Sequence, residues 1–214
     1  MQKKPVVHLP RKRASQDRAK FTVQVIYDGF VQIWRRQGPG AVNTRAIAEE
    51  TGFAVGTIYE YFPNATALLS GYVRHCIEWE MDRLRARDQL LCQAPWTERL
   101  AELVRITAGA DPEAPYLDRT MLLQEGQIAL DTHHRRAFEK LSDTWIEIIT
   151  GWPDLTNPPT PDSIRNLFTL VWGARRYRLL AQIETQELGD WLDATYAMCQ
   201  SLIGANASQG NTTM

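Results

Sequence analysis

Several features that define other classes of protein are missing from this sequence. Its 214 residues contain no uninterrupted apolar run of about 18 residues, which argues against a membrane-spanning helix. The basic N-terminus leads into polar sequence instead of an apolar core, so we expect no secretory signal and predict a cytoplasmic protein. The cysteines are odd in number and widely spaced (Cys76, Cys92 and Cys199), which favours free thiols over a disulfide framework or a zinc site.

The motifs of catalysis are missing as well. The sequence has no glycine-rich phosphate loop, no recognisable nucleophile–base set and no cluster of metal-ligating residues. The adjacent His133 and His134 would point about 100° apart on a helix, so they are poorly placed to share one ion. We therefore expect that the chain is not an enzyme and holds neither a cofactor nor a metal.

The apolar residues predict an all-α protein. No segment alternates strongly between apolar and polar residues as a half-buried strand does, and apolar positions recur at helical spacing instead. Residues 1–14 are predicted to form a flexible basic arm, and residues 204–214 a disordered tail. Glycine and proline residues separate about nine expected helices, over 15–37, 44–51, 55–61, 66–91, 96–108, 116–130, 135–150, 162–183 and 187–202.

The charge is distributed unevenly along the chain. Residues 1–65 carry ten Lys and Arg against five Asp and Glu, whereas residues 66–214 carry fourteen against twenty. The positive charge of residues 1–65 indicates that this part of the chain, and not the negatively charged remainder, binds a polyanion such as a nucleic acid.

The segment from Asn43 to Phe62 is the most informative part of the sequence. Asn43 can cap the helix over 44–51, and Gly52 can adopt the positive φ that a sharp turn needs before the helix over 55–61. Ala48 is small where two helix axes would approach each other. Ile47, Phe53 and Ile58 are spaced to face a core shared with the first helix, which leaves outside Thr57, Tyr59, Glu60 and Tyr61.

This arrangement is typical of a helix-turn-helix, whose second helix lies in the major groove of DNA. A plain helical hairpin within a bundle has similar spacing and remains the alternative.

Residues 20–70 resemble the DNA-binding domain of TetR-family (TetR/AcrR-like) transcriptional regulators. The first helix ends at Gly38, and Arg45-x-Ile47-Ala48 and Gly52 precede the run Gly56-Thr-Ile-Tyr-x-Tyr-Phe62 and Leu68-Leu69. The resemblance implies a helix-turn-helix domain of three helices over 15–65 and a C-terminal helical domain for ligand binding and dimerisation over 66–203. It also implies a homodimer, a palindromic operator in double-stranded DNA, and a small ligand that releases the DNA.

The sequence departs from the family pattern at several positions. Ala54 stands where a Ser or Thr usually caps the second helix of the pair, and Val55 and Ala65 replace positions that are often Lys. Gly29 and Phe30 occupy positions of the first helix where alanines are usual. These changes weaken the binding that we expect to the DNA phosphates. We expect basic residues of the arm and the first helix to compensate, namely Arg11, Lys12, Arg13, Arg18 and Lys20.

We assign phosphate contacts to the hydroxyl and guanidinium groups of the two short helices, and base contacts to Thr57 and Glu60. Two alternatives stay open: Glu60 is an exposed charge that repels phosphates, or the Tyr61 ring packs against the first helix. The complete predicted DNA-binding set is Arg13, Lys20, Thr44, Arg45, Val55, Gly56, Thr57, Tyr59, Glu60 and Tyr61.

The region after residue 65 is rich in aromatic residues, which predicts a pocket for a small apolar or aromatic ligand. Its predicted lining is His75, Trp79, Trp96, Gln124, Phe138, Trp145, Phe168, Trp172 and Arg175. Ordinary core packing is the alternative for each aromatic residue. The last two helices carry more apolar residues than one helical pair can bury, and we predict a dimer interface at Leu180, Leu188, Trp191, Leu192 and Tyr196.

The sequence therefore favours a sequence-specific DNA-binding transcriptional regulator, and within that class a repressor that a small ligand releases from its operator. The alternatives are a transcriptional activator without ligand-induced release and a helical module that binds protein instead of DNA.

Overall fold

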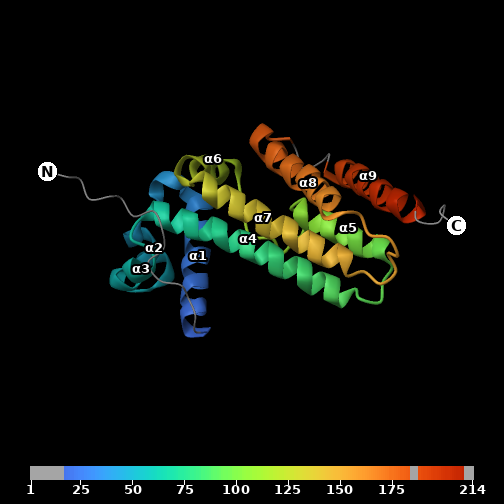
Figure 1. The fold of residues 1–214 in the computed structure, drawn as a ribbon. Helices are drawn as coiled ribbons and strands as arrows, with labels where there is room; N and C mark the ends of the chain where they lie inside the picture. Colours follow the sequence, from blue (N-terminus) through green and yellow to red (C-terminus); the bar gives the residue numbers. More distant parts are fainter. Residues whose placement is uncertain (1–16, 184–187, 210–214) are drawn as a thin grey trace. The chain divides into compact units, whose positions relative to one another are not determined.

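The computed structural model describes residues 17–183 and 188–209 of the chain, the last four as backbone only. These residues form nine α-helices, one 3-10 helix and no strand (Figure 1), which confirms the all-α prediction. The elements are α1 (Asp17–Gln37), η1 (Pro39–Ala41), α2 (Thr44–Thr51), α3 (Val55–Tyr61), α4 (Ala65–Leu90), α5 (Trp96–Thr107), α6 (Arg119–Ile128), α7 (Asp131–Thr150), α8 (Pro161–Ala181) and α9 (Leu188–Gln209).

Some helix ends differ from the expected ones for identifiable reasons. Helix α4 begins before Thr66, because Asn64 Oδ1 accepts the amide N–H of Ala67 (2.8 Å) and caps the helix. Helix α6 begins at Arg119 and not at Tyr116, because the cap is Asp118, whose Oδ1 accepts the amide N–H of Met121 (2.7 Å). Helix α7 begins at Asp131, earlier than expected.

The C-terminal helix is longer than expected. Helix α9 continues to Gln209, so the disorder predicted from residue 204 is wrong for residues 204–209. Ile203 is fully buried and anchors this end of the helix in the core. The predicted arm over 1–14 and the end of the predicted tail lie outside the described residues.

The chain divides into two compact units. Among the described residues, the first unit contains 17–75 and 116–129, and therefore α1, α2, α3, the start of α4 and α6. The second unit contains 76–115, 130–183 and 188–209, and therefore the remainder of α4 with α5, α7, α8 and α9. The functional domains predicted over 15–65 and 66–203 stay predictions.

The first unit is built around α1. Its Ile26 and Phe30 are fully buried, as are Ile47 of α2 and Ile58 of α3. These apolar residues recur at helical spacing, so one side of each short helix faces the common core.

Helix α6 is tied to the first unit by polar contacts at its start. Trp34 Nε1 of α1 donates a hydrogen bond to Asp118 Oδ2 (2.9 Å), and the Tyr116 hydroxyl donates to the same oxygen (3.0 Å). The Tyr72 hydroxyl of α4 donates to the carbonyl of Tyr116 (2.7 Å). Asp118 thus caps α6 with one carboxylate oxygen and holds the helix to α1 with the other.

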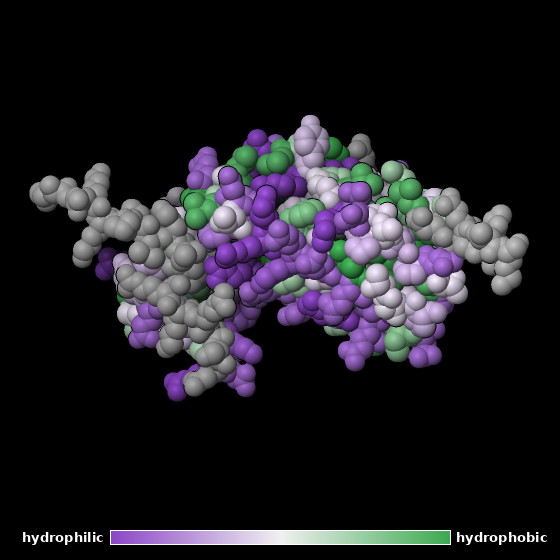
Figure 2. Space-filling model, in the orientation of Figure 1, coloured by the Kyte–Doolittle hydropathy of each residue, from purple (hydrophilic) through white to green (hydrophobic). Residues whose placement is uncertain are grey.

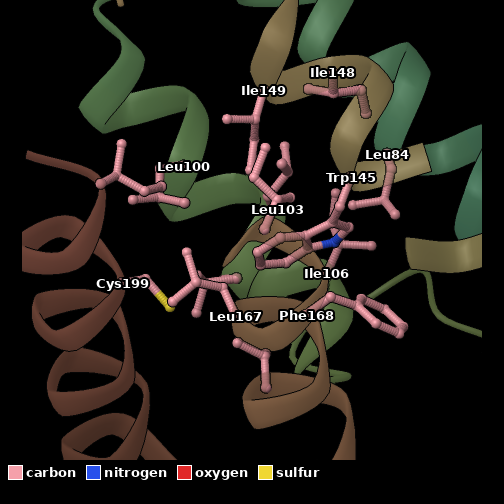
Figure 3. Close-up of a cluster of buried hydrophobic side chains, with 14 of the residues drawn as sticks. Leu84, Leu100, Leu103, Ile106, Trp145, Ile148, Ile149, Leu167, Phe168 and Cys199 are labelled. Carbon is pink, nitrogen blue, oxygen red and sulfur yellow. The ribbon is translucent and has the colours of Figure 1, made fainter. Parts of the chain in front are cut away.

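The second unit has its own apolar core, which Figure 3 shows around Trp145. Helix α7 packs on α8, and α5 packs on both α8 and α9. Trp145 is fully buried, and its Nε1 donates to Thr107 Oγ1 (3.0 Å). Burial raises the pKa of the Cys199 thiol to about 11, so this core cysteine stays protonated at neutral pH and is a poor nucleophile.

The face drawn in Figure 2 is mostly hydrophilic, with hydrophobic side chains in separate groups. Among the described helices, none has both the length and the apolar character needed to cross a bilayer. The described residues also contain no group of three or more His, Cys, Asp or Glu side chains that could hold a metal ion.

Candidate nucleic-acid interface

The two short helices of the first unit are joined by the tight turn that the sequence predicts. Asn43 has an extended backbone, and its Oδ1 accepts the amide N–H groups of Arg45 (3.1 Å) and Ala46 (2.9 Å) at the start of α2. Gly52 ends α2 at φ 72°, a left-handed conformation that glycine adopts without steric cost. The predicted N-cap and the predicted turn glycine are both confirmed.

Helix α3 begins without a side-chain cap. Ala54 occupies the N-cap position with φ −62° and ψ 142°, and its methyl side chain cannot accept a hydrogen bond from the free amide groups there. This agrees with the departure from the family pattern noted at Ala54. The first amide groups of α3 are therefore less satisfied than those of α2.

Helices α1 and α2 approach each other closely at Gly29. A Cβ atom added to Gly29 would lie 2.7 Å from Thr51 Cγ2 of α2, so only glycine fits without a shift of its neighbour. Arg36 of α1 forms an ion pair with Glu50 of α2. These contacts fix α2, and with it the turn into α3, against the core of the first unit.

One side of α3 is exposed. Ile58 points into the core and is fully buried, whereas Tyr59 is 45% exposed and Glu60 is exposed. Val55 and Gly56 are exposed at the start of the helix, and Thr57 is half-buried. A Cβ at Gly56 would meet no atom of the described residues within 4 Å, so the backbone there is open on that side. We call Val55, Gly56, Thr57, Tyr59 and Glu60 the α3 face.

Tyr61 does not belong to this face. It is only 6% exposed, so the prediction that its side chain lies outside is wrong. Tyr61 follows Ile58 by three residues, and residues three apart lie on the same side of a helix. Its ring lies beside that of Phe62, with centroids 6.4 Å apart. The Tyr61 side chain is therefore packed inside the first unit, whereas the alternative that its ring packs against the first helix stays a prediction.

The candidate phosphate-binding residues on the other helices are placed differently from one another. Arg45 is exposed on α2 beside Glu49 (3.8 Å), and Thr44 is half-buried at the first position of that helix. Lys20 is exposed on α1 near Asp17 (4.0 Å). Arg13 lies outside the described residues.

Comparison with known proteins bears directly on these elements. Residues 17–71 match the family model of the bacterial regulatory proteins of the tetR family. This N-terminal domain belongs to the TetR family. The matched residues comprise α1, η1, α2, α3 and the start of α4, which include the turn and the α3 face. The family is one of regulatory proteins, which confirms the prediction that the chain is not an enzyme.

Solved structures share the fold over most of the chain. A TetR transcription regulator from Haloarcula marismortui is 18% identical, with 87% of this chain and 98% of that chain covered and a TM-score of 0.61. A TetR-family regulator from Streptomyces coelicolor is 15% identical (86% and 98% covered, TM-score 0.57). The SmeT–triclosan complex is 16% identical (83% and 91% covered, TM-score 0.51). The sequence matches none of the curated proteins.

The TetR-like fold includes the second unit, where most of the predicted ligand-binding residues lie. Trp145 and Phe168 are fully buried there, Phe138 and Trp172 are half-buried, and the four rings form one cluster through the pairs 138–168, 138–172, 145–168 and 168–172. We call these four residues the aromatic cluster. Arg175 is on the same helix as Trp172, one turn later.

The remaining predicted ligand-binding residues lie elsewhere. Trp79 and Trp96 are half-buried against the core of the second unit. His75 and Gln124 belong to the first unit, where the His75 ring lies 5.0 Å from that of Tyr27. The structure therefore does not bring His75 and Gln124 into one unit with the aromatic cluster.

The predicted dimer residues are half-buried within one chain. Trp191, Leu192 and Tyr196 pack against the core of the second unit, and the Arg178 guanidinium lies 4.9 Å from the centre of the Trp191 ring. Leu180 and Leu188 are also half-buried. The large apolar side chains that α8 and α9 expose are others, namely Leu170, Tyr177, Met198 and Leu202. Their spacings of seven and four residues are a helical-face signal that the sequence analysis missed.

Proposed function

We propose that this TetR-family protein is a sequence-specific DNA-binding transcriptional regulator that places the α3 face in the major groove. The proposal is supported by a family match that includes this helix-turn-helix and by the exposure of Tyr59, Glu60 and Gly56 on its second helix. A bare backbone at Gly56 allows close approach to the groove floor. Thr57 and Glu60 are the candidates for base contacts, because a threonine methyl suits thymine and a carboxylate accepts from cytosine N4.

Phosphate contacts are proposed for groups around this face. Arg45 and Thr44 lie at the start of α2, Tyr59 lies on α3, and Lys20 lies on α1. Arg13 is proposed to contribute from the N-terminal segment. The excess of positive charge in residues 1–65 favours binding to a polyanion.

The protein is further proposed to act in the cytoplasm as a homodimer on a palindromic operator. Two copies of α3 would then reach successive major grooves, about 34–36 Å apart. A ligand that binds the second unit would favour a dimer state in which this spacing is lost, so ligand and DNA would oppose each other's binding equally. The aromatic cluster and the similarity in fold to the triclosan complex of SmeT support a ligand-released repressor.

The test begins with selection of DNA duplexes from a random pool by the purified full chain, followed by fluorescence anisotropy titrations on the selected sequence. We expect a palindromic consensus and an affinity that falls steeply with salt, with a log–log slope of about −0.9 for each phosphate neutralised. Failure to enrich any sequence, or binding that is insensitive to salt, would contradict the proposal and favour a protein-binding module.

Variants separate the two kinds of contact. Arg45→Ala should weaken binding to all duplexes alike and reduce the salt slope by about 1, whereas Glu60→Gln should change the preferred base at one position of each half-site. Arg136→Ala is the matched control, since Arg136 is an exposed arginine on α7 in the second unit. An Arg136→Ala variant with the same loss as Arg45→Ala would show that the effect is one of net charge and not of the interface.

A further inference from the structure

Glu80 of α4 carries a buried carboxylate oxygen that no group among the described residues satisfies. The side chain is only 7% exposed, and its Oε2 accepts a hydrogen bond from Nη1 of Arg175 on α8 (2.8 Å). The other oxygen, Oε1, is buried and has no hydrogen-bond partner within residues 17–183 and 188–209. Buried polar atoms in native proteins are nearly always paired, so an exception calls for an explanation.

Other contacts hold Arg175 in a position from which it donates a hydrogen bond to Oε2 of Glu80 and not to Oε1. Its Nη1 also donates to the carbonyl of Thr107 (3.3 Å). Its guanidinium lies so close to Gly109 that a Cβ there would be 2.7 Å from Arg175 Nε. Burial raises the pKa of the Glu80 carboxyl, although Arg175 acts to lower it. A raised pKa is typical of a carboxyl group in poorly hydrated surroundings.

The aromatic cluster adjoins this ion pair. Thr107, whose carbonyl accepts from Arg175, receives the Trp145 Nε1 hydrogen bond on its hydroxyl (3.0 Å). The Trp145 ring meets the Phe168 ring edge to face (5.9 Å), and Phe168 stacks on Trp172 (5.7 Å). Trp172 and Phe138, unlike Trp145 and Phe168, are only half-buried.

We infer that Oε1 of Glu80 is the hydrogen-bond acceptor for a neutral aromatic ligand that carries an N–H or O–H donor and packs on Trp172 and Phe138. A donor is required by the ionised form of Glu80 that pairs with Arg175, because an ionised carboxylate oxygen can only accept. A neutral ligand is favoured because Arg175 already balances the charge of Glu80, and a cation would add a buried charge without a partner. This inference rests on the proposed ligand-sensing function and adds the chemistry of the ligand.

The test uses two probes of nearly the same shape, indole with an N–H donor and benzofuran with a ring oxygen in its place. Equilibrium dialysis against the full chain at neutral pH measures the affinity of each. We expect indole to bind about tenfold more tightly, the effect of one hydrogen bond to a charged group. Preference for benzofuran, equal binding of the two probes, or no binding of indole would overturn the inference.

Two variants locate the effect. Glu80→Gln keeps an acceptor for Arg175 but can place an amide NH₂ at the position of Oε1, so indole affinity should fall about tenfold while benzofuran affinity is retained. Glu78→Gln, on the same helix but exposed, should leave both affinities unchanged. Unchanged indole affinity in folded Glu80→Gln would also overturn the inference. If circular dichroism shows that this variant does not fold, the wild-type affinity for 1-methylindole, which lacks the N–H donor, takes its place as the test. It should be about tenfold weaker than the affinity for indole, and equal affinities would overturn the inference.

DNA binding is measured separately, so the two proposals can fail independently. Indole that binds with the expected selectivity but leaves affinity for the selected duplex unchanged supports the Glu80 site and contradicts ligand-induced release. A chain that binds the duplex but does not distinguish the probes keeps its proposed DNA-binding function and loses the Glu80 site.

Discussion

At the scale of single residues, Gly29 sets how closely α1 approaches α2. A Gly→Ala change in an exposed helix usually gains about 1 kcal/mol. Here the new Cβ would lie 2.7 Å from Thr51 Cγ2, and the Thr51 side chain is held because its Oγ1 donates to the Ile47 carbonyl (2.7 Å). We expect Gly29→Ala to lower the free energy of unfolding by about 1–2 kcal/mol in urea titrations followed by circular dichroism.

Two further variants test whether the contact with Thr51 causes the loss of stability in Gly29→Ala. Thr51→Ser removes the opposing methyl group and keeps the hydroxyl, so Gly29→Ala should cost little or nothing in that background. Gly126→Ala on α6, where a Cβ meets no atom within 4 Å, should be neutral or stabilising. Equal losses from Gly29→Ala and Gly126→Ala would show that the approach of α2 is not the cause.

The two helix caps make a second prediction at this scale. Asn43 accepts two amide hydrogen bonds at the start of α2, so Asn43→Ala should destabilise the protein by about 1 kcal/mol. Ala54 has the extended backbone of an N-cap but no side-chain acceptor, so Ala54→Ser should stabilise it by about 0.5–1 kcal/mol. Thermal unfolding monitored at 222 nm measures both changes, and a shift of the same sign in the two variants would contradict the capping argument.

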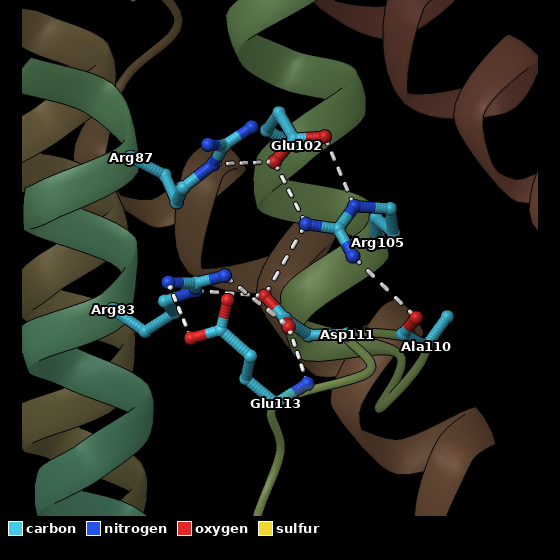
Figure 4. Close-up of polar contacts among 7 residues, drawn as sticks. All are labelled: Arg83, Arg87, Glu102, Arg105, Ala110, Asp111 and Glu113. Carbon is cyan, nitrogen blue, oxygen red and sulfur yellow. Dashed lines mark hydrogen bonds and ion pairs between the residues drawn. The ribbon is translucent and has the colours of Figure 1, made fainter. Parts of the chain in front are cut away.

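At the scale of elements, Asp111 joins α4 to the end of α5 (Figure 4). Its buried carboxylate accepts from Arg83 (2.9 Å), Arg105 (3.2 Å) and the amide of Glu113 (2.9 Å). Burial alone would raise the pKa of Asp111, but these bonds and charges outweigh it and lower the pKa. Because the folded state has the lower pKa, the stabilisation is present at neutral pH and is lost as the pH falls through that value.

We therefore expect Asp111→Asn to lower the free energy of unfolding by about 1–3 kcal/mol at pH 7 and to flatten its decline in acid. Urea titrations between about pH 7 and pH 3 measure this, since the ordinary pKa of Asp is about 4. Glu113→Gln is the control, because the Glu113 side chain is 67% exposed and its ion pair with Arg83 contributes little. A Glu113→Gln variant as unstable as Asp111→Asn would place the stabilisation in the exposed pair.

Elements defined by local signals could be predicted from the sequence, and those that depend on distant contacts could not. Asn43 and Gly52 act on their immediate neighbours, so the ends of α2 follow from residue type alone. The place of α6 depends on the bond between Trp34 and Asp118, 84 residues apart, which no local pattern contains. The burial of Tyr61, by contrast, follows from a local signal, because Tyr61 lies three residues after the buried Ile58 on the same side of α3.

At the scale of the whole molecule, the exposed apolar residues of α8 and α9 bear on dimerisation. Of the residues predicted from the sequence, Trp191, Leu192 and Tyr196 already pack against the core of their own chain, which leaves less of their surface for a partner. Leu170 and Tyr177 on α8, and Met198 and Leu202 on α9, expose large apolar side chains at helical spacing. Burying these side chains against a second copy would remove apolar surface from water, at about 25 cal/mol per Å².

Tyr177→Lys is therefore expected to weaken the proposed homodimer, because it places a charge where an apolar ring, 69% exposed in the single chain, would be buried. Sedimentation velocity over a range of concentrations should show a shift toward monomer of at least about tenfold in the dissociation constant. Affinity for a palindromic duplex should fall with it, while affinity for an isolated half-site should not. Leu90→Lys, equally exposed at the end of α4, is the matched control. If Tyr177→Lys leaves the oligomeric state unchanged, or Leu90→Lys dissociates the protein as strongly, the α8–α9 surface is not the interface.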